Sequence, residues 1–528
     1  MGLRLPYRSL ARLYTPGHRI PFRSRLMSTR TYKDAVDRLN SLQSNAATLE
    51  AVRALGGRAS TFAIPEMVEY LERIGYTQED LDTLNVLHVT GTKGKGSTCA
   101  FLDSILRHTK PNWKIGLYTS PHLIAVRERI RVNGQPISEE DFAKYFFEVW
   151  DRLEKNEQRK FPETPSKPAY FRYMTLLAFH VFSSMKVDAT ILEVGVGGTY
   201  DSTNIVPHPV VTGISALGID HTAVLGKTLE EIAWQKGGIY KAGVPALTVN
   251  QPEQGLAVLK QRSIELNASE FNIVPLIPEL ADIRLGSPGE HQVQNANLAI
   301  HLASKFLQIK DGYKPQESLP KTFVEGLESA KWPDGAHTVE SLECCMQWFV
   351  SPDVALRDVS GGRPRRVLIF NCTSGRSGSS FLGTMLSKTA AQLKLFGANE
   401  EAGQLLDHVI FCTNITYADG GFKGGNIFAV WNVTMGIDIY TDLTTLAIPK
   451  DDLMHLKTQQ DLASAWSSLV PTFPTANIHV LPSIEHAIGT VRGLSVEEGC
   501  GHTDVLVAGS LHLVGGVIEV AGLADVAL

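Results

Sequence analysis

Apolar and polar positions first follow a helical period along this chain. Apolar residues recur at helical spacing at Tyr32, Ala35, Val36, Leu39 and Leu42, and again at Met67, Tyr70, Leu71 and Ile74. A stripe of this kind leaves one face of a helix apolar and the other polar. Both groups therefore predict an amphipathic helix that packs on a core.

Short and almost continuous apolar runs then alternate with helical stretches. They cover 86–89, 115–118, 189–194, 210–215 and 244–249, and the alternation restarts at 367–370, 409–412, 478–481 and 505–508. Such runs are typical of parallel strands that helices cover on both faces. The prediction is an α/β protein with a parallel-sheet domain followed by a smaller α/β domain.

The length of the chain, 528 residues, also favours two domains, because single cores rarely grow so large. The polar, proline-containing stretch 310–333 is the expected boundary, which gives domains over 31–330 and 331–528. In open parallel sheets, ligands bind beyond the carboxyl ends of the strands. We expect the active site there, in the cleft between the domains.

Charge and composition exclude several classes of protein. The net charge of −5 gives no electrostatic reason to expect nucleic acid or an anionic membrane as a partner. No apolar run reaches the length that spans a bilayer. The six cysteines contain no C-x-x-C pair, which argues against a zinc site and a disulfide scaffold and indicates a reducing compartment.

The first thirty residues differ from the rest, since they carry seven arginines and no acidic residue occurs before Asp34. This composition predicts a mitochondrial transit segment over 1–30, with a disordered basic tail as the alternative. Initiation at Met27 would omit most of the segment. We therefore expect supply to both mitochondria, in the matrix or at the inner membrane, and the cytoplasm.

The run from Leu84 to Ser97 leads from an apolar strand into a glycine-rich turn with a lysine. Gly91, Thr92, Lys93, Gly94, Lys95, Gly96 and Ser97 form this turn. Glycines let backbone N–H groups converge on an anion, the next helix adds its positive end, and Lys95 adds a charge. The strict P-loop pattern is not met, because Gly96 follows Lys95 and Val89 occupies the first glycine position. A phosphate site is predicted, and a solvated loop is the alternative.

Three polar groups follow other predicted strands. Ser120 lies in Thr119-Ser120-Pro121-His122, Glu193 ends the run 189–194, and His221 follows Asp220 after the run 210–215. Hydroxyl, carboxylate and imidazole groups can ligate a cation, and magnesium is the natural partner of a buried carboxylate beside a phosphate site. Taken singly, they also fit a turn, a salt-bridged strand residue and a structural histidine.

The order of these motifs resembles the folylpolyglutamate synthase family, within the Mur ligase superfamily of ATP-dependent amide-forming enzymes. The motifs lie at Leu42–Ala46, Gly91–Ser97, Thr119–Leu123, the Glu193 loop, Asp220-His221, His291–Ala296, Asp334–Thr338 and Gly509–Gly516. The resemblance implies a ligase that uses MgATP to activate the γ-carboxylate of a reduced folate as an acyl phosphate, which L-glutamate then attacks.

The resemblance also assigns roles to residues. Gly94 to Ser97 would hold the ATP phosphates, and Ser120, Glu193 and His221 would hold Mg²⁺. Lys236 occupies the position of an N-carboxylated lysine, Asn295 and Asp334 would contact ATP, and His337 lies beside it. Lys95, Lys236 and His337 are the expected catalytic residues. A monovalent cation such as K⁺ is a further candidate cofactor, and a monomer with peripheral contact to the mitochondrial membrane is expected.

One departure from the family pattern falls before Asp334. The family shows tryptophan-proline-glycine-arginine, a β-hairpin and then D-G-A-H, whereas Trp332-Pro333 here runs directly into Asp334. An incorrectly assembled gene model or a splice variant would explain the missing segment, and an impaired protein is the alternative. A bifunctional dihydrofolate synthase, a P-loop kinase and an inactive binding paralogue are the competing functions.

Overall fold

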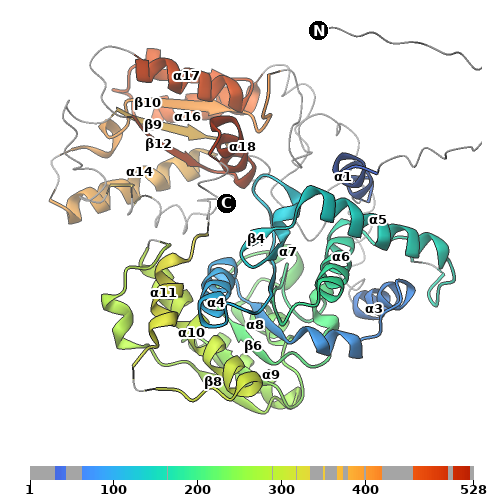
Figure 1. The fold of residues 1–528 in the computed structure, drawn as a ribbon. Helices are drawn as coiled ribbons and strands as arrows, with labels where there is room; N and C mark the ends of the chain where they lie inside the picture. The colour runs from blue at the N-terminus through green and yellow to red at the C-terminus, as the bar shows by residue number, and fades with distance from the viewer. Residues whose placement is uncertain are drawn as a thin grey trace, which may run out of the picture.

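Two β-sheets organise the computed structural model of the chain (Figure 1). The structure describes residues 30–42, residues 62–332 except 163, 288 and 317, and then 346, 349–350, 365–372, 378–397, 400–418, 456–496 and 503–523. Within these residues, an eight-stranded sheet precedes a four-stranded one. The predicted α/β class and its order of a larger and a smaller sheet are confirmed.

The first sheet has the order β4-β3-β2-β5-β1-β6-β7-β8. Its strands are β1 Val86–Thr90, β2 Ile115–Tyr118, β3 Ile130–Val132, β4 Gln135–Pro136, β5 Ala189–Glu193, β6 Val211–Ile214, β7 Pro245–Thr248 and β8 Glu270–Ile273. Six neighbouring strands from β2 to β8 pair in parallel, and five of them coincide with the continuous apolar runs, whereas β8 was not predicted. The edge strand β4 and its neighbour β3 are antiparallel, which the sequence patterns did not indicate.

Helices cover both faces of this sheet because successive strand residues point to opposite sides. Leu192 of β5 contributes to one core and its neighbour Ile191 to the other. The first core is formed with α1 Tyr32–Asn40, α3 Ala63–Arg73, α5 Glu139–Lys155 and α6 Tyr170–Met185, and the second with α4 Lys95–Thr109, α10 Glu290–Asp311 and α11 Lys321–Ser329. The helices predicted around Ala35 and Tyr70 are α1 and α3.

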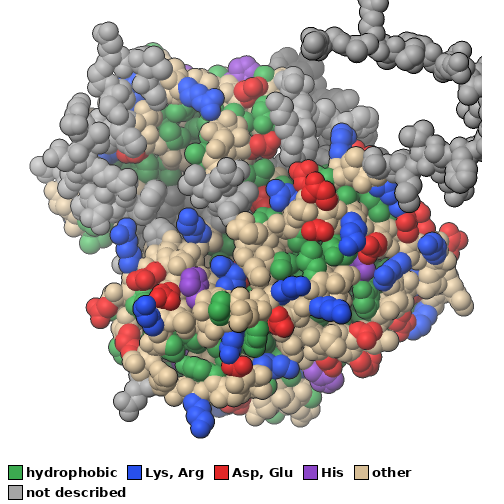
Figure 2. Space-filling view, in the orientation of Figure 1, with side chains coloured by type: hydrophobic (Ala, Val, Ile, Leu, Met, Phe, Trp, Pro, Cys, Tyr) green, Lys and Arg blue, Asp and Glu red, His purple; other side chains and the backbone are tan. Residues whose placement is uncertain are grey.

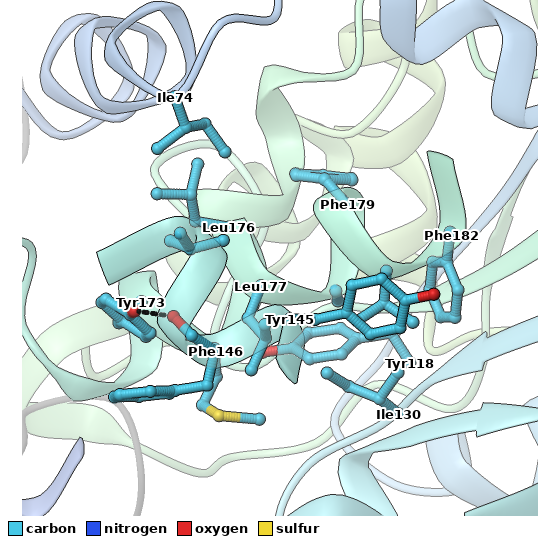
Figure 3. Packing of buried hydrophobic residues seen from close by; sticks show 14 of the residues in the cluster. Ile74, Tyr118, Ile130, Tyr145, Phe146, Tyr173, Leu176, Leu177, Phe179 and Phe182 are labelled. Carbon is cyan, nitrogen blue, oxygen red and sulfur yellow. Dashed lines mark hydrogen bonds between the residues drawn. The ribbon is translucent and has the colours of Figure 1, made fainter. Parts of the chain in front are cut away.

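Aromatic side chains dominate the first core (Figure 3). Phe146 and Tyr173 pack with ring centroids 4.9 Å apart, and the Tyr173 hydroxyl donates a hydrogen bond to the Phe146 carbonyl at 2.9 Å. Tyr118, the last residue of β2, is buried in the same cluster. The end of β2 is thereby held in place directly before the loop that carries Ser120.

The remaining helices of the first part are α7 Thr222–Leu225, α8 Leu229–Gly237 and α9 Glu253–Glu265. Short 3-10 turns lie at Glu79–Leu84, Val126–Arg129, Ser202–Ile205 and Pro278–Asp282. Trp332 packs against the core of α4, α10 and α11, so the first part extends at least to this residue. The boundary expected at 330 stays a prediction.

The second sheet has the order β11-β10-β9-β12, and all its strands are parallel. They are β9 Arg365–Phe370, β10 His408–Cys412, β11 Ile478–Leu481 and β12 Thr503–Ala508, with α14 Gly378–Leu395, α16 Lys457–Leu469, α17 Ile484–Val496 and α18 Leu511–Ala521. Three-residue turns lie at Ala402–Gln404 and Thr475–Asn477. All nine apolar runs that predict strands coincide with strands of the two sheets.

The distribution of charged side chains on the surface agrees with the small net charge of the chain. On the face shown in Figure 2, Lys and Arg side chains are interspersed with Asp and Glu over the first part of the chain. In the described part of the chain, no helix is both long enough and apolar enough to cross a membrane.

Candidate active site

The site lies where four neighbouring strands of the first sheet end. β2, β5, β1 and β6 are adjacent and parallel, so their carboxyl ends meet at one edge. Val89 of β1 lies opposite Glu193 of β5, and Thr90 lies opposite Ile214 of β6. The loops that carry the predicted phosphate, metal and histidine residues therefore leave the sheet side by side.

The phosphate loop passes from β1 into α4 at Gly94. This residue is the N-cap of α4 and has a positive φ of 80°, which favours glycine. A methyl group at Gly94 would lie 2.0 Å from Oδ1 of Asn295, so a side chain has no room here. The structure thus brings Asn295 of α10 against the loop, and its predicted contact with ATP stays a prediction. The backbone N–H groups of the first turn of α4 form the positive end that binds anions.

Thr92 and Lys93 anchor the loop to the chain after β6. Their backbone N–H groups donate to the Ala216 carbonyl at 2.9 and 3.1 Å, and Thr92 Oγ1 exchanges hydrogen bonds with Gly218. Lys93 Nζ forms an ion pair with Asp220 at 3.1 Å. In the predicted set Gly91 to Ser97, Thr92 and Lys93 therefore anchor the loop, whereas Gly94 to Ser97 form the start of α4.

Two lysines converge on one carbonyl oxygen of the loop. Lys95 Nζ donates to the Gly91 oxygen at 3.1 Å, and Lys236 Nζ donates to the same oxygen at 2.8 Å. Burial and then the charge of Lys95 hold the pKa of Lys236 well below its usual value. The Lys236 amine is thus poised to be uncharged, beside a lysine that supplies the positive charge.

A capping box sets the position of Lys236 on α8. Thr228 Oγ1 accepts the backbone N–H of Glu231 at 3.2 Å, and the Glu231 carboxylate accepts that of Thr228 at 3.0 Å. Near the end of the helix, the Gln235 carbonyl accepts the N–H of Thr199 at 2.8 Å. This bond ties the glycine-rich loop after Glu193 to the residue beside Lys236.

The structure also brings Glu193 and Ser120 together. Glu193 is 3% exposed, and its Oε2 accepts the backbone N–H of Ser120 at 3.0 Å. His221 begins α7 with a positive φ of 49°, next to Asp220. Burial opposes ionisation of Asp220, but Lys93 and His221 outweigh it and hold the Asp220 pKa at about 2.

Among the described residues, no cluster of three or more His, Cys, Asp and Glu side chains is arranged to hold a metal ion. The predicted metal set contains only two such residues, because its third member is the hydroxyl of Ser120. A carboxylate and a hydroxyl at adjoining strand ends fit magnesium, which prefers oxygen and keeps several waters. The joint role of Ser120, Glu193 and His221 stays a prediction.

Two contacts at the phosphate loop were missed by sequence reasoning. Gln292 Nε2 donates to Ser97 Oγ at 3.3 Å, and Asn295 Nδ2 donates to Gln292 Oε1 at 3.0 Å. The indole of Trp332 covers Gly96, where a methyl group would lie 2.8 Å from Nε1. Gln292 belongs to the His291–Ala296 motif and could have been singled out. The predicted nucleotide residues Asp334 and His337 lie outside the described residues.

The chain has close relatives among characterised proteins. It is 43% identical to "Folylpolyglutamate synthase" of Neurospora crassa, over 99% of this chain and 98% of the relative. The chain belongs to the folylpolyglutamate synthase family. A protein of the same name from Saccharomyces cerevisiae is 41% identical over 95% of this chain and 88% of the relative. No protein-family model matches the chain.

Solved structures agree on the fold. "Mycobacterium tuberculosis Folylpolyglutamate synthase complexed with ADP" superposes with a TM-score of 0.64 at 19% identity, covering 93% of this chain and 99% of the other. An "FPGS-AMPPCP complex" reaches a TM-score of 0.60 at 19% identity, over 94% of this chain and all of the other. The two-domain α/β architecture is shared, and the family membership makes this chain a ligase that forms amide bonds.

Proposed function

We propose that this chain uses its strand-end site to join L-glutamate to the γ-carboxylate of a reduced folate, with ATP as the energy source. The observation that carries the proposal is the convergence of Lys95 and Lys236 on the Gly91 carbonyl, at the edge where Glu193 meets Ser120. Solved structures of similar fold that contain ADP, AMPPCP or, in an "FPGS-AMPPCP-folate complex", folate support a nucleotide and a folate as two of these substrates.

The reaction has two steps. The folate γ-carboxylate attacks the γ-phosphorus of ATP, so that an acyl phosphate forms and ADP leaves. The amine of glutamate then attacks the acyl carbon, the amide bond forms, and inorganic phosphate leaves with the loss of a proton from the amine. Both steps place negative charge on phosphate oxygens, so fixed positive charge is what the site must supply.

The residues of this chain fit that requirement. Lys95 supplies a positive charge at the phosphate loop, and the N–H groups at the start of α4 add their partial charge. Asn295 and Gln292 hold the loop from the side of α10. Ser120, Glu193 and His221 would hold magnesium, which when bound neutralises charge on the transferring phosphoryl group.

The lowered pKa of Lys236 supports its N-carboxylation. An amine must lose its proton before it can attack carbon dioxide, and the burial that lowers the pKa of Lys236 favours this form. The product is a carbamate anion, which is a ligand for hard cations. We propose that Lys236 carries this group in the active enzyme, and a ¹³C carbonyl signal after incubation with ¹³C-bicarbonate, absent from Lys236→Met, would support it.

A substrate panel tests the proposal against its rivals. The purified chain is given MgATP and glutamate with either a reduced folate or dihydropteroate, and products are separated by mass. Glutamate addition to the folate alone supports the proposal, and addition to dihydropteroate as well identifies the bifunctional synthase. Phosphorylation of the pterin compound without amide formation would support a kinase, and binding without turnover an inactive paralogue.

We further propose that the chain is supplied to mitochondria and the cytoplasm, works as a monomer, and contacts the mitochondrial membrane only peripherally. The arginine-rich residues 1–30 support the first point, and they lie outside the described residues except Arg30. A reporter fused to residues 1–30 should enter mitochondria, whereas a chain that starts at Met27 should stay cytosolic. Equal distributions would refute targeting, light scattering at dimer mass would refute the monomer, and carbonate extraction tests the membrane contact.

A further inference from the structure

Helix α18 of the second part reaches the loop that follows β2 in the first. Gly515, in the second turn of α18, lies so close to this loop that a methyl group there would be 1.9 Å from the Leu123 carbonyl oxygen and 2.7 Å from its carbonyl carbon. Figure 1 shows α18 as a helix of the second part that faces the first. Gly515 belongs to the Gly509–Gly516 motif, for which neither the site nor the mechanism gives a role.

We propose that Gly515 is a positioning residue, the point at which the second domain docks on the loop 119–125 and so sets the geometry of Ser120 and Glu193 for catalysis. Only glycine, whose side chain is a hydrogen atom, leaves room at this position for α18 to approach the Leu123 carbonyl. Real carbon atoms do not come within 2 Å of a carbonyl oxygen, and this obstacle is backbone, which cannot rotate away as a side chain can.

The loop that receives Gly515 is held firmly on its other side. The Glu128 carboxylate is 4% exposed and accepts the backbone N–H groups of Leu123 and Ile124, both at 3.0 Å, and that of Ala125. A push on Leu123 from α18 therefore cannot be absorbed by local rearrangement alone. It would be passed along the short stretch to Ser120, whose N–H holds the Glu193 carboxylate.

This inference rests on the proposed function, because Ser120 and Glu193 are taken as parts of the ligase site. It predicts that a substitution at Gly515 affects nucleotide binding and catalysis differently. Nucleotide binding depends on the phosphate loop and Asn295, which lie within the first part, so the affinity for ATP should survive a change at Gly515. Formation of the amide bond with glutamate needs the two parts in the correct relative position, so this step should be slowed.

Helix α17 offers a matched control. Gly489 is also a glycine inside a helix of the second part, and a methyl group there would meet nothing within 4 Å. Gly516, next to the docking residue, would bring its methyl group to 2.4 Å from the Ile484 side-chain end, a contact inside the second part. The variants Gly515→Ala, Gly516→Ala and Gly489→Ala thus each add one methyl group to a helix of the second part. They differ in the atoms that this methyl group would contact.

The experiment measures kcat and KM for all three full-length variants, with the affinity for AMPPCP and the thermal midpoint. Gly515→Ala should lose at least about tenfold in kcat while AMPPCP affinity stays within twofold of wild type, because misplacing reacting groups slows the chemistry. The thermal midpoint shows whether each variant remains folded at the assay temperature, so that a lower kcat is not caused by unfolding. Gly489→Ala should match wild type, and Gly516→Ala should change stability more than kcat. Wild-type kcat in Gly515→Ala would overturn the proposal.

Hydrogen exchange tests the contact without relying on activity. Peptides that cover 119–126 should exchange faster in Gly515→Ala than in wild type or Gly489→Ala, because the loop loses the helix that covers it. Unchanged exchange together with lost activity would also overturn the proposal, since the damage would then act elsewhere. A wild-type chain without ligase activity would instead contradict the proposed function, and the exchange result would still decide whether the two parts dock at Gly515.

Discussion

At the scale of single residues, the site brings Lys95 and the buried Lys236 to the same carbonyl oxygen. Lys236 is 2% exposed, and in such a place a second charge beside Lys95 would be costly. Its lowered pKa resolves this conflict by favouring the uncharged amine. Both residues are lysines, so the reactive amine of Lys236 results from its burial and not from its residue type.

Replacement of Lys95 by alanine should lower glutamate ligation by at least ~10²-fold, because backbone N–H groups alone cannot replace a full charge on the phosphates. The rate is measured as ADP released per enzyme with folate and glutamate present. Lys321→Ala removes a lysine whose side chain is 89% exposed and should leave the rate unchanged. A near-normal rate in Lys95→Ala would remove the loop from the mechanism.

Glu193→Gln should raise the magnesium concentration needed for half-maximal rate by roughly tenfold or more. The amide keeps an oxygen that can accept the Ser120 N–H, so the fold should survive while the anion is lost. Glu69→Gln is the matched control, since Glu69 is also 3% exposed and accepts the Lys160 N–H, but belongs to α3. If both variants responded to magnesium as wild type does, Glu193 would be structural.

The buried amine of Lys236 should also appear in the pH dependence of stability. Because its folded pKa is lowered, the unfolded chain binds more protons between the folded and unfolded pKa values, and stability rises with pH across that interval. Lys236→Met removes this slope. In CO₂-free buffer, the free energy of unfolding of wild type should therefore increase relative to the variant as the pH rises toward 10.5, the ordinary pKa of lysine, in urea titrations. A constant difference would contradict a titrating buried lysine.

At the scale of elements, α4 connects the phosphate loop to the core. The segment between the two sheets begins near Trp332, which packs on the first turn of α4. The Trp332 indole covers Gly96, and the Arg131 guanidinium lies 5.7 Å from the centre of the indole ring. Arg131 is buried on β3, the strand next to the edge of the sheet, which sequence patterns missed. The contact therefore joins the strand edge, the phosphate loop and the segment leading to Asp334.

Trp332→Ala should raise the KM for ATP by about tenfold, because the loop and the Asp334 segment lose a common support. Trp113→Ala is the matched control, since Trp113 packs against the same core and contacts Phe306 with ring centroids 6.3 Å apart. Both changes should lower the free energy of unfolding, by about 1–3 kcal/mol, and only the first should change the KM. Equal KM values would show that Trp332 only fills space.

Sequence patterns predicted the elements whose residues are buried on both sides. β1, β2 and β5 to β7 are almost wholly apolar, so periodicity and length identified them. Sequence patterns did not predict β3 and β4, which span three and two residues and include Arg131 and Gln135. They also did not predict β8, whose residues are half-buried or exposed. The approach of Asn295 to Gly94 and of Gly515 to Leu123 joins segments distant in sequence, and no local pattern encodes such contacts.

At the scale of the whole molecule, the family resemblance predicts that a segment is missing before Asp334. The alignment with the Neurospora crassa relative spans 550 residues, more than the 528 of this chain, so that relative carries residues without a counterpart here. The affected stretch lies outside the described residues. Four parallel strands still form the second sheet without it.

Restoring the family segment between Pro333 and Asp334 should increase activity or soluble yield. The arginine in that segment would add a charge-assisted contact to the nucleotide worth roughly 1.5–3 kcal/mol, and the hairpin would cover backbone groups at a sheet edge. Both forms are expressed side by side and compared for soluble protein and for KM of ATP. Equal solubility and turnover would show that the segment is dispensable.

The central claim is that this strand-end site forms an amide between glutamate and a folate at the expense of ATP. The most direct measurement incubates the purified chain with magnesium, ATP, ¹⁵N-glutamate and a reduced folate, and follows ADP and folate mass together. The account predicts one ADP for each glutamyl residue added, with the ¹⁵N label in the new amide and no product when ATP or glutamate is omitted. ATP hydrolysis without a labelled folate, from a chain that is folded and binds nucleotide, would contradict it.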